Sequence, residues 1–161
     1  MNRAATILLV VTSIVVIGID QLSKIWIVEW LGLRTDPDGI DVWPPFLQFR
    51  MGWNTGVNFG LFDGQSEAQR WLLIGLAVAI SIGLTIWAIR AGRRFIAIAC
   101  GLIIGGALGN AWDRVTYGAV ADFLNMSCCG IENPFVFNLA DTAIFMGAAL
   151  LILAPSGPQK T

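Results

Sequence analysis

The chain has 161 residues, of which 56% are hydrophobic and 13% charged, and its mean hydropathy is +0.71. Ordinary soluble domains have about 45–50% apolar and about 25% charged residues, so the composition indicates a single membrane domain over residues 1–161. The net charge of −1 argues against a nucleic-acid partner. The sequence contains no histidine, which excludes Ser-His and Cys-His catalysis and every histidine-containing metal motif. We therefore expect neither a metal nor a cofactor.

Four apolar segments approach the ~20 residues that cross a bilayer, and they cover about 4–19, 71–89, 95–112 and 135–154. The first segment could alternatively be a cleaved signal peptide, but no small-x-small cleavage site precedes "GIDQLSK", so we interpret it as a retained span. The third segment has small residues four positions apart on one helical face, a spacing that lets helices approach closely in a bilayer. These residues are Ala97, Gly101, Gly105 and Gly109.

Basic residues in the short links predict the orientation of the chain. The link "RAGRR" at 90–94 contains three arginines and no acid, and Arg3 and Lys160 lie near the termini. The links 20–70 and 113–134 contain more acidic than basic residues. Because short basic links remain on the cytoplasmic side, we expect both termini to be cytoplasmic and the two longer links to lie outside.

The longer of the two outer links is expected to form a small β-platform over about residues 34–62, on the outer surface of the membrane that the chain spans. Within it, the residues "FLQFRM" at 46–51 alternate loosely and are bracketed by Gly and Pro, which is typical of short strands. An irregular loop is the alternative. The expected fold class is therefore an all-α membrane protein, with four transmembrane helices and this platform.

Polar residues gather at the outer ends of the apolar segments. Asp141 lies about six residues into the fourth segment, which is roughly 9 Å deep at ~1.5 Å per residue. A charged residue at the bilayer centre costs roughly 2.5–3.5 kcal/mol on insertion scales, so its presence there indicates a functional site. The other polar residues at this level are Asp20, Lys24, Asn54, Asn110, Asp113, Arg114, Asp122 and Asn138.

Most of these residues also have a purely structural interpretation. Asp20 and Lys24 are four positions apart and could form only an ion pair at a helix end. The asparagines could satisfy backbone groups where helices end, and Asp122 could be a solvated loop acid. Asp113 and Arg114 are adjacent and point apart on a helix, so structural roles are expected for them.

Asp122 and Asp141 could form a catalytic pair if the second outer link folds back. Two carboxylates that share one proton can act as general acid and general base. The ionised one activates a water to attack a carbonyl, and the protonated one polarises that carbonyl and later protonates the leaving amine. This chemistry requires neither histidine nor metal.

The order of the motifs resembles the lipoprotein signal peptidase family, also called signal peptidase II, whose members are membrane aspartic peptidases. The resemblance covers nearly the whole chain, and the third and fourth blocks together are highly specific, whereas "RAGRR" is a weak signal. The blocks are "DQLSK" at 20–24, "NTGVNFG" at 54–60, "GNAWDRVTYGAVADF" at 109–123, "FNLAD" at 137–141 and the "RAGRR" turn.

The resemblance implies that Asp122 and Asp141 are the catalytic dyad of an aspartic endopeptidase in a bacterial inner membrane, near its outer leaflet. It implies four transmembrane helices below a small β-platform. The implied substrates are prolipoproteins, cleaved just before a cysteine that carries a diacylglyceryl group, and we expect a monomer in contact with membrane lipids. Residues implied to bind the substrate or brace the site are Asn54, Gly56, Asn110, Arg114, Asn138, Asp20, Lys24 and Asp113.

Two stretches depart from the family pattern. "NTGVNFG" has Val57 and Asn58 where members often have small residues, which puts the local packing in doubt. The stretch "NMSCCGIENPF" is not typical of the family, so Cys128 and Cys129 have no inherited role.

Three other functions compete with this interpretation. A proton-coupled transporter could use Asp141 and Asp20 as relay groups, but it predicts polar residues throughout the membrane depth. A non-catalytic assembly subunit would explain the glycine face but not the paired acids. A Ser-Lys peptidase could use Ser23 and Lys24, but adjacent residues on a helix do not face each other.

Overall fold

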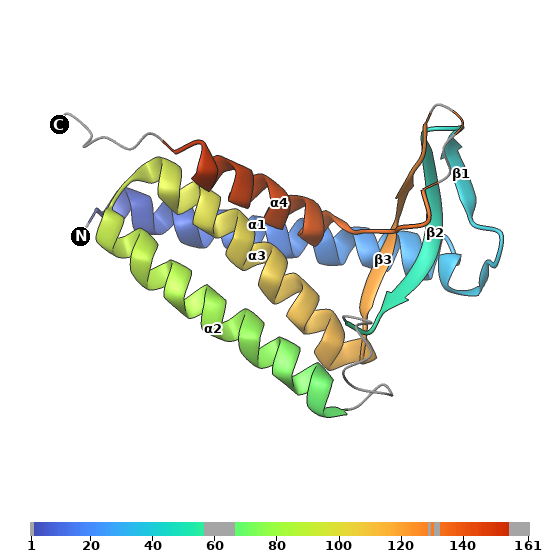
Figure 1. Cartoon of the computed structure of the whole chain (residues 1–161), viewed down its shortest axis with the longest axis horizontal. Helices are drawn as coiled ribbons and strands as arrows, with labels where there is room; N and C mark the ends of the chain where they lie inside the picture. The colour runs from blue at the N-terminus through green and yellow to red at the C-terminus, as the bar shows by residue number, and fades with distance from the viewer. Residues whose placement is uncertain (1, 57–66, 129, 131–132, 155–161) are drawn as a thin grey trace.

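The computed structural model describes residues 2–56, 67–128, 130 and 133–154. Four α-helices lie side by side, with α3 packed against each of the other three, and a small sheet lies across one end of the bundle (Figure 1). The protein is thus mostly helical with a small sheet. The helices are α1 (Arg3–Lys24), α2 (Glu67–Ala91), α3 (Arg94–Tyr117) and α4 (Leu139–Ile152).

Three of the described helices are long and apolar enough to cross a membrane: α2, α3, and α1 together with the π-helical segment Ile25–Trp30 that continues it. Helix α1 continues beyond the predicted first span, 4–19, through a buried polar stretch to Lys24. The predicted second and third spans are also shorter than α2 and α3.

Helix α4 begins later than the fourth predicted span, 135–154. The backbone of Phe137 pairs with that of Leu124, and the helix begins only at Leu139, after a cap formed by Asn138. α4 has 14 residues, and its length is about 21 Å at ~1.5 Å per residue. Asp141 therefore lies in the first turn of α4.

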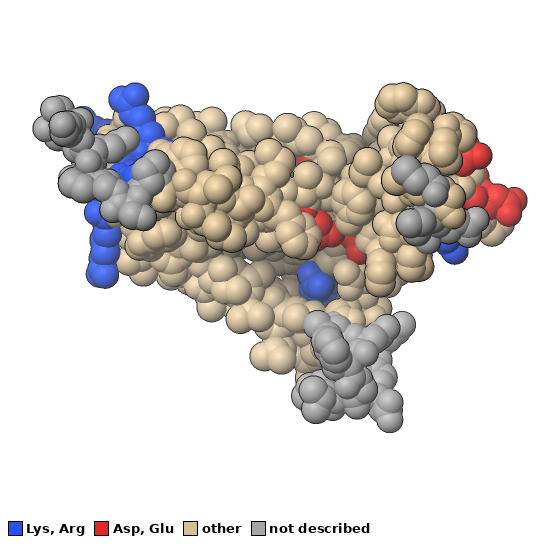
Figure 2. Space-filling view, turned by 45° about the horizontal axis from the view of Figure 1, so that its top comes forward, with Lys and Arg blue, Asp and Glu red and all other residues tan. Residues whose placement is uncertain are grey.

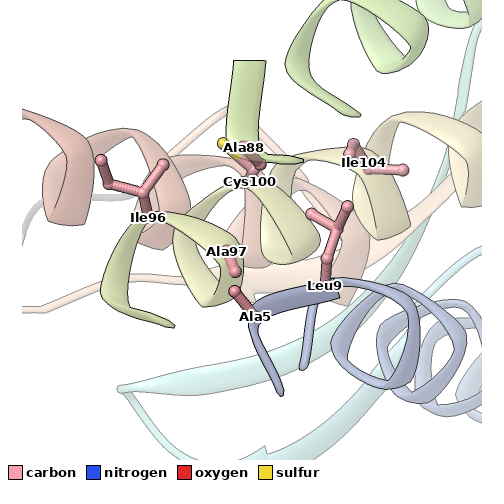
Figure 3. Close-up of a cluster of buried hydrophobic side chains, with 7 residues drawn as sticks. All are labelled: Ala5, Leu9, Ala88, Ile96, Ala97, Cys100 and Ile104. Atoms are coloured by element: carbon pink, nitrogen blue, oxygen red, sulfur yellow. The ribbon is translucent and has the colours of Figure 1, made fainter. Parts of the chain in front are cut away.

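The glycine face of α3 is packed against α1, as the spacing of small residues predicts. A Cβ on Gly101 would lie 2.9 Å from the Leu9 carbonyl oxygen, and one on Gly105 would lie 2.8 Å from that of Ser13. At the end of the bundle opposite the sheet, an apolar cluster from α1, α2 and α3 fills the interior (Figure 3). Its buried members are Ala5, Leu9, Ala88, Ile96, Ala97, Cys100 and Ile104.

The sheet is antiparallel with strand order β1-β2-β3. β2 shows that the strand prediction for 46–51 is correct and that the irregular-loop alternative is wrong there, whereas the part of the predicted platform at 57–62 lies outside the described residues. β3 comes from the link 113–134 and was not predicted. The strands are β1 (Ile40–Trp43), β2 (Leu47–Asn54) and β3 (Val120–Met126).

A second apolar cluster joins the sheet to the helices. Phe123 of β3 is fully buried and packs with Ile27, Val28 and Leu33, which follow α1 in the chain. Phe49 of β2 packs edge to face on Phe123, with the ring centroids 6.1 Å apart. These contacts hold β3 at the end of the bundle, beside the first turn of α4.

Candidate active site

Asp122 is carried into the site by β3, whose residues 120–123 are all buried. Its side chain is 2% exposed and points toward the first turn of α4. Two residues separate the end of α3 from β3, and Gly118 closes α3 with a positive φ of 80° that favours glycine. The short turn therefore brings Asp122 back to the helical bundle.

Asn138 connects the two candidate catalytic carboxylates. Its Oδ1 accepts a 2.8 Å hydrogen bond from the backbone N–H of Asp141, and its own N–H donates to Asp141 Oδ2 at 3.4 Å, which together form a capping box. Its Nδ2 donates to Asp122 Oδ1 at 2.7 Å. Asn138 is fully buried, so it holds both acids in a fixed relation.

Two further asparagines complete the hydrogen bonding of the acids. Asn110 of α3 donates from Nδ2 to Asp141 Oδ1 at 2.8 Å, and its own Oδ1 accepts from Asn138 at 3.1 Å. Asn54 of β2 donates from Nδ2 to Asp122 Oδ2 at 3.1 Å. The three asparagines come from different parts of the chain and converge on one pair of carboxylates.

The electrostatic environment favours a proton on Asp122. Burial and, to a smaller extent, the nearby Asp141 carboxylate raise the pKa of the Asp122 carboxyl to about 7. The hydrogen bonds from Asn54 and Asn138 and the charge of Lys24 lower the same pKa by less. One of two neighbouring acids thus titrates near neutrality, which is the arrangement required for paired general acid and general base catalysis.

Arg114 and Gly56 lie at the edge of this arrangement. Arg114 donates to the Asn110 carbonyl oxygen at 3.3 Å and interacts electrostatically with both Asp122 and Asp141. Gly56 donates its N–H to Asn54 Oδ1 at 3.0 Å. Its φ of 112° favours glycine, and a Cβ there would lie 2.7 Å from the side chain of Leu73. Gly56 therefore shapes the turn that positions Asn54.

Asp20, Lys24 and Asp113 form a buried cluster of charges between α1 and α3. Lys24 Nζ lies 2.6 Å from Asp20 Oδ2 and 2.7 Å from Asp113 Oδ2. The expected ion pair within α1 is present. Lys24 also pairs with Asp113 of α3, so the contact is more than an ion pair at one helix end. Ser23 donates instead to the Asp20 carbonyl oxygen at 2.7 Å, so it makes no pair with Lys24.

Gln21 belongs to the same cluster and was missed from the sequence. Its Nε2 donates to Asp113 Oδ1 at 2.9 Å and to Asp20 Oδ2 at 3.1 Å. Its position inside "DQLSK" was the available signal, but the partner that reveals its role is on α3. Val57, Asn58 and Cys129 lie outside the described residues, and Cys128 is exposed.

Charge is distributed unevenly over the surface. Figure 2 shows Lys and Arg side chains gathered at the end of the bundle opposite the sheet, and acidic side chains that reach the surface beside a basic one between bundle and sheet. Among the described residues, no group of three or more His, Cys, Asp or Glu side chains could hold a metal ion. The fold and site define a helical membrane protein with paired carboxylates, a class to which aspartic peptidases belong.

Comparison with known proteins identifies the family. A family model described as signal peptidase (SPase) II matches residues 12–155. Lipoprotein signal peptidases of Methylorubrum extorquens and Caulobacter vibrioides are 45% and 44% identical, over 89% and 86% of this chain and 85% and 80% of their own lengths. A solved structure described as a bacterial membrane enzyme superposes with a TM-score of 0.76 at 28% identity, covering 95% of this chain and 93% of that one. The chain belongs to the signal peptidase II family and is therefore a peptidase, a hydrolase of peptide bonds.

Proposed function

We propose that this protein is a lipoprotein signal peptidase that removes signal peptides from prolipoproteins, cleaving just before a cysteine that carries a diacylglyceryl group. The observation that carries the proposal is the contact of one buried side chain, Asn138, with both Asp122 and Asp141. The names of the similar proteins support the choice of substrate class.

In the proposed mechanism, Asp141 is ionised and Asp122 carries the shared proton. Asp141 takes a proton from water as the water oxygen attacks the scissile carbonyl carbon, while Asp122 donates its proton to the carbonyl oxygen. The tetrahedral intermediate then collapses. Asp141 returns its proton to the leaving amine as the C–N bond breaks, and Asp122 recovers its proton from the hydroxyl group. The dyad ends in its starting state.

The asparagines keep this pair ready for catalysis. Amide hydrogen bonds from Asn54 and Asn138 hold the Asp122 carboxyl, and Asn110 holds Asp141. Groups held in advance need no reorganisation during the reaction, which lowers the barrier. In this proposal, Arg114 lies close enough to the dyad to interact with negative charge that develops there.

We place the protein in a bacterial inner membrane with α1 to α4 as four spans and both termini in the cytoplasm. The basic α2–α3 turn, with Arg90, Arg93 and Arg94, supports this orientation under the positive-inside rule. The dyad then lies near the outer leaflet. α4 is short, but an extended apolar stretch at 135–137 precedes it and adds to its reach.

A lipid-anchored substrate would present its scissile bond at this level of the membrane. Its acyl chains would lie along the apolar outer faces of the helices, and exposed aromatic residues of the platform, such as Trp43 and Trp53, would contact the peptide from above. Aromatic rings favour the membrane interface, and such positioning supplies much of a rate enhancement. Binding of this kind requires one copy of the chain, so we propose a monomer in contact with membrane lipids.

The test is cleavage of a diacylglyceryl-modified prolipoprotein by the purified protein in detergent. Asp122→Asn and Asp141→Asn keep the shape of each side chain but remove the carboxylate, and we expect each to lower kcat by roughly 10²- to 10⁴-fold or more. Asp41→Asn is the matched control, because Asp41 is an exposed acid of β1. Near-normal activity of a folded Asp122→Asn or Asp141→Asn protein would contradict the dyad, and an inactive wild type would contradict the substrate assignment.

A further inference from the structure

The buried charge cluster has contacts beyond its own three members. Lys24, Asp20 and Asp113 are all 2% exposed or less, and together they have a net charge of one negative. Asp20 Oδ1 accepts a 3.0 Å hydrogen bond from the backbone N–H of Ala140. Asp113 Oδ2 accepts a 3.1 Å hydrogen bond from the backbone N–H of Ala121.

These two backbone groups directly precede the candidate catalytic acids. Ala140 is followed by Asp141, and Ala121 is followed by Asp122. Each carboxylate of the cluster therefore holds the main chain one residue before one member of the dyad. A single ammonium group on Lys24 joins the two carboxylates, so it connects the positions of both acids.

The strength of these contacts follows from their burial. Hydrogen bonds to an ionised acceptor are roughly twice as strong as those between neutral groups. Without the Lys24 ammonium, Asp20 and Asp113 would be two like charges facing each other in a buried site, and the structure would move to separate or hydrate them. Either movement would displace Ala140 or Ala121, and with it one of the catalytic acids.

We propose that Lys24 is a positioning residue, which sets the separation of Asp122 and Asp141 through its contacts with Asp20 and Asp113. Its charge also affects how long the dyad keeps its shared proton as the pH rises. This inference rests on the proposed function, because it concerns the rate of the same reaction. It assigns Lys24 no contact with the substrate.

The charge of Lys24 affects the pKa of Asp122 in a definite direction. The charged groups near Asp122 are Asp141 from α4, Lys24 from α1, and Arg114 and Asp113 from α3. Burial and Asp141 raise the pKa of Asp122, and the charge of Lys24 opposes that rise. Removing the Lys24 charge therefore keeps Asp122 protonated to higher pH, and the alkaline limit of activity moves upward.

The experiment compares Lys24→Met with a charge-balanced variant, Lys24→Met/Asp113→Asn. Lys24→Met should lower kcat by roughly 10- to 100-fold, with little change in KM, and move the alkaline limit of the pH profile upward. The double variant retains Asp20 as one negative charge, which is the net charge of the original cluster. It should return the alkaline limit toward that of wild type while kcat remains low, because the bridge between α1 and α3 is still missing.

Ser13→Ala is the control for packing alone. Ser13 is buried in α1 and joins it to α3 by a 3.2 Å hydrogen bond to the Gly101 carbonyl oxygen, far along the helix from the dyad. It should lower the unfolding temperature in detergent without moving the pH profile. Thermal unfolding and gel filtration of each variant establish that it is folded.

A folded Lys24→Met protein with wild-type kcat and pH profile would overturn the inference while the proposed function stands, since wild type would still cleave. So would a double variant whose alkaline limit is displaced as far as that of Lys24→Met. If Lys24→Met does not fold, the double variant decides: a low kcat at the wild-type pH profile supports the inference, and a wild-type kcat overturns it. An inactive wild type would instead contradict the proposed function.

Discussion

The two ends of the helical bundle are stabilised by different means. At the end opposite the sheet, Ala5, Leu9 and Cys100 belong to a buried cluster that contains only apolar side chains (Figure 3). At the sheet end, the apolar cluster around Phe123 lies beside buried carboxylates, amides and one ammonium group, which include Lys24 and Asn138. The same helices, α1 and α3, contribute to both ends.

This difference separates stability from geometry. Apolar packing is non-directional, so the first end stabilises the bundle without setting any polar group in place. A buried polar network is directional, and it contributes little net stability because desolvation offsets its attraction. The sheet end therefore determines the positions of Asp122 and Asp141, while the opposite end keeps the helices together.

The largest effect is expected from Asn138. Asn138→Ala removes the α4 cap and the hydrogen bonds to both Asp122 and Asn110. We expect kcat to fall by roughly 10²-fold or more and the free energy of unfolding to fall by about 1–2 kcal/mol. Asn138→Ser separates the two roles, because serine can still cap the helix but cannot donate to Asp122. Recovery of full activity in Asn138→Ser would show that only the cap matters.

The pH dependence is expected to be the next largest effect. The pKa of Asp122 is about 7, so the protonated form is lost as pH rises above that value, and kcat/KM should fall about tenfold per pH unit on the alkaline side. Asn54→Ala removes a hydrogen bond that lowers this pKa, so the alkaline limit should move upward. A profile that is flat from pH 6 to about 9 would contradict the assignment of the proton to Asp122.

The same pKa affects stability with a defined sign. Asp122 has a higher pKa in the folded protein than its ordinary value of 3.8, so the folded state holds a proton that the unfolded state has lost between pH 3.8 and about 7. This contribution to the free energy of unfolding is fully present below that window and is lost as pH rises through it. Unfolding in detergent as a function of pH should show the fall in wild type and a smaller fall in Asp122→Asn.

A smaller effect is expected at the end opposite the sheet, and it should appear in stability rather than activity. Gly101→Ala places a Cβ 2.8 Å from that of Thr12 and should cost about 1–3 kcal/mol through overpacking. Gly83→Ala in α2 is the matched control, because nothing lies within 4 Å of its Cβ position. It should be neutral or slightly stabilising. Loss of kcat in a folded Gly101→Ala protein would show that the two ends are not independent.

The smallest effect is expected for an ion pair at the sheet end that is exposed. Arg34 and Glu29 are 3.1 Å apart, but their side chains are 50% and 40% exposed. Glu29→Gln should change the free energy of unfolding by less than about 1 kcal/mol, because water screens such pairs. Thermal unfolding in detergent measures this change. A loss of about 3 kcal/mol or more, the size expected when one partner of a buried ion pair is removed, would contradict this role of exposure.

The parts of the molecule predicted best from the sequence are those that depend on local pattern. Long apolar runs predicted the three longest helices, and the spacing of Gly101 and Gly105 predicted the face of α3 that packs against a neighbouring helix. Two helix ends differ from the ends of the predicted spans. α1 continues past Asp20 because a buried ion pair compensates its charge, and α4 begins late because Phe137 is paired with Leu124.

The candidate site was only partly predictable. Asp141 is notable in the sequence because a charge beside an apolar run is costly, and the motif resemblance named Asp122 with it. The third strand was missed because β3 depends on its pairing with β2, about 70 positions earlier in the chain. Gln21 was missed because its main partner, Asp113, lies on another helix.

The sequence by itself determined that this chain is a membrane protein without histidine chemistry, that its polar residues lie at one end of its helices, and that it belongs to a peptidase family. Composition and periodicity are local properties, so they need no knowledge of the fold. Only the tertiary structure decided that Asn138 contacts both acids and that Lys24 bridges Asp20 to Asp113. These contacts depend on distances and directions in the folded chain, because a buried polar group is stable only where the fold provides its hydrogen bonds.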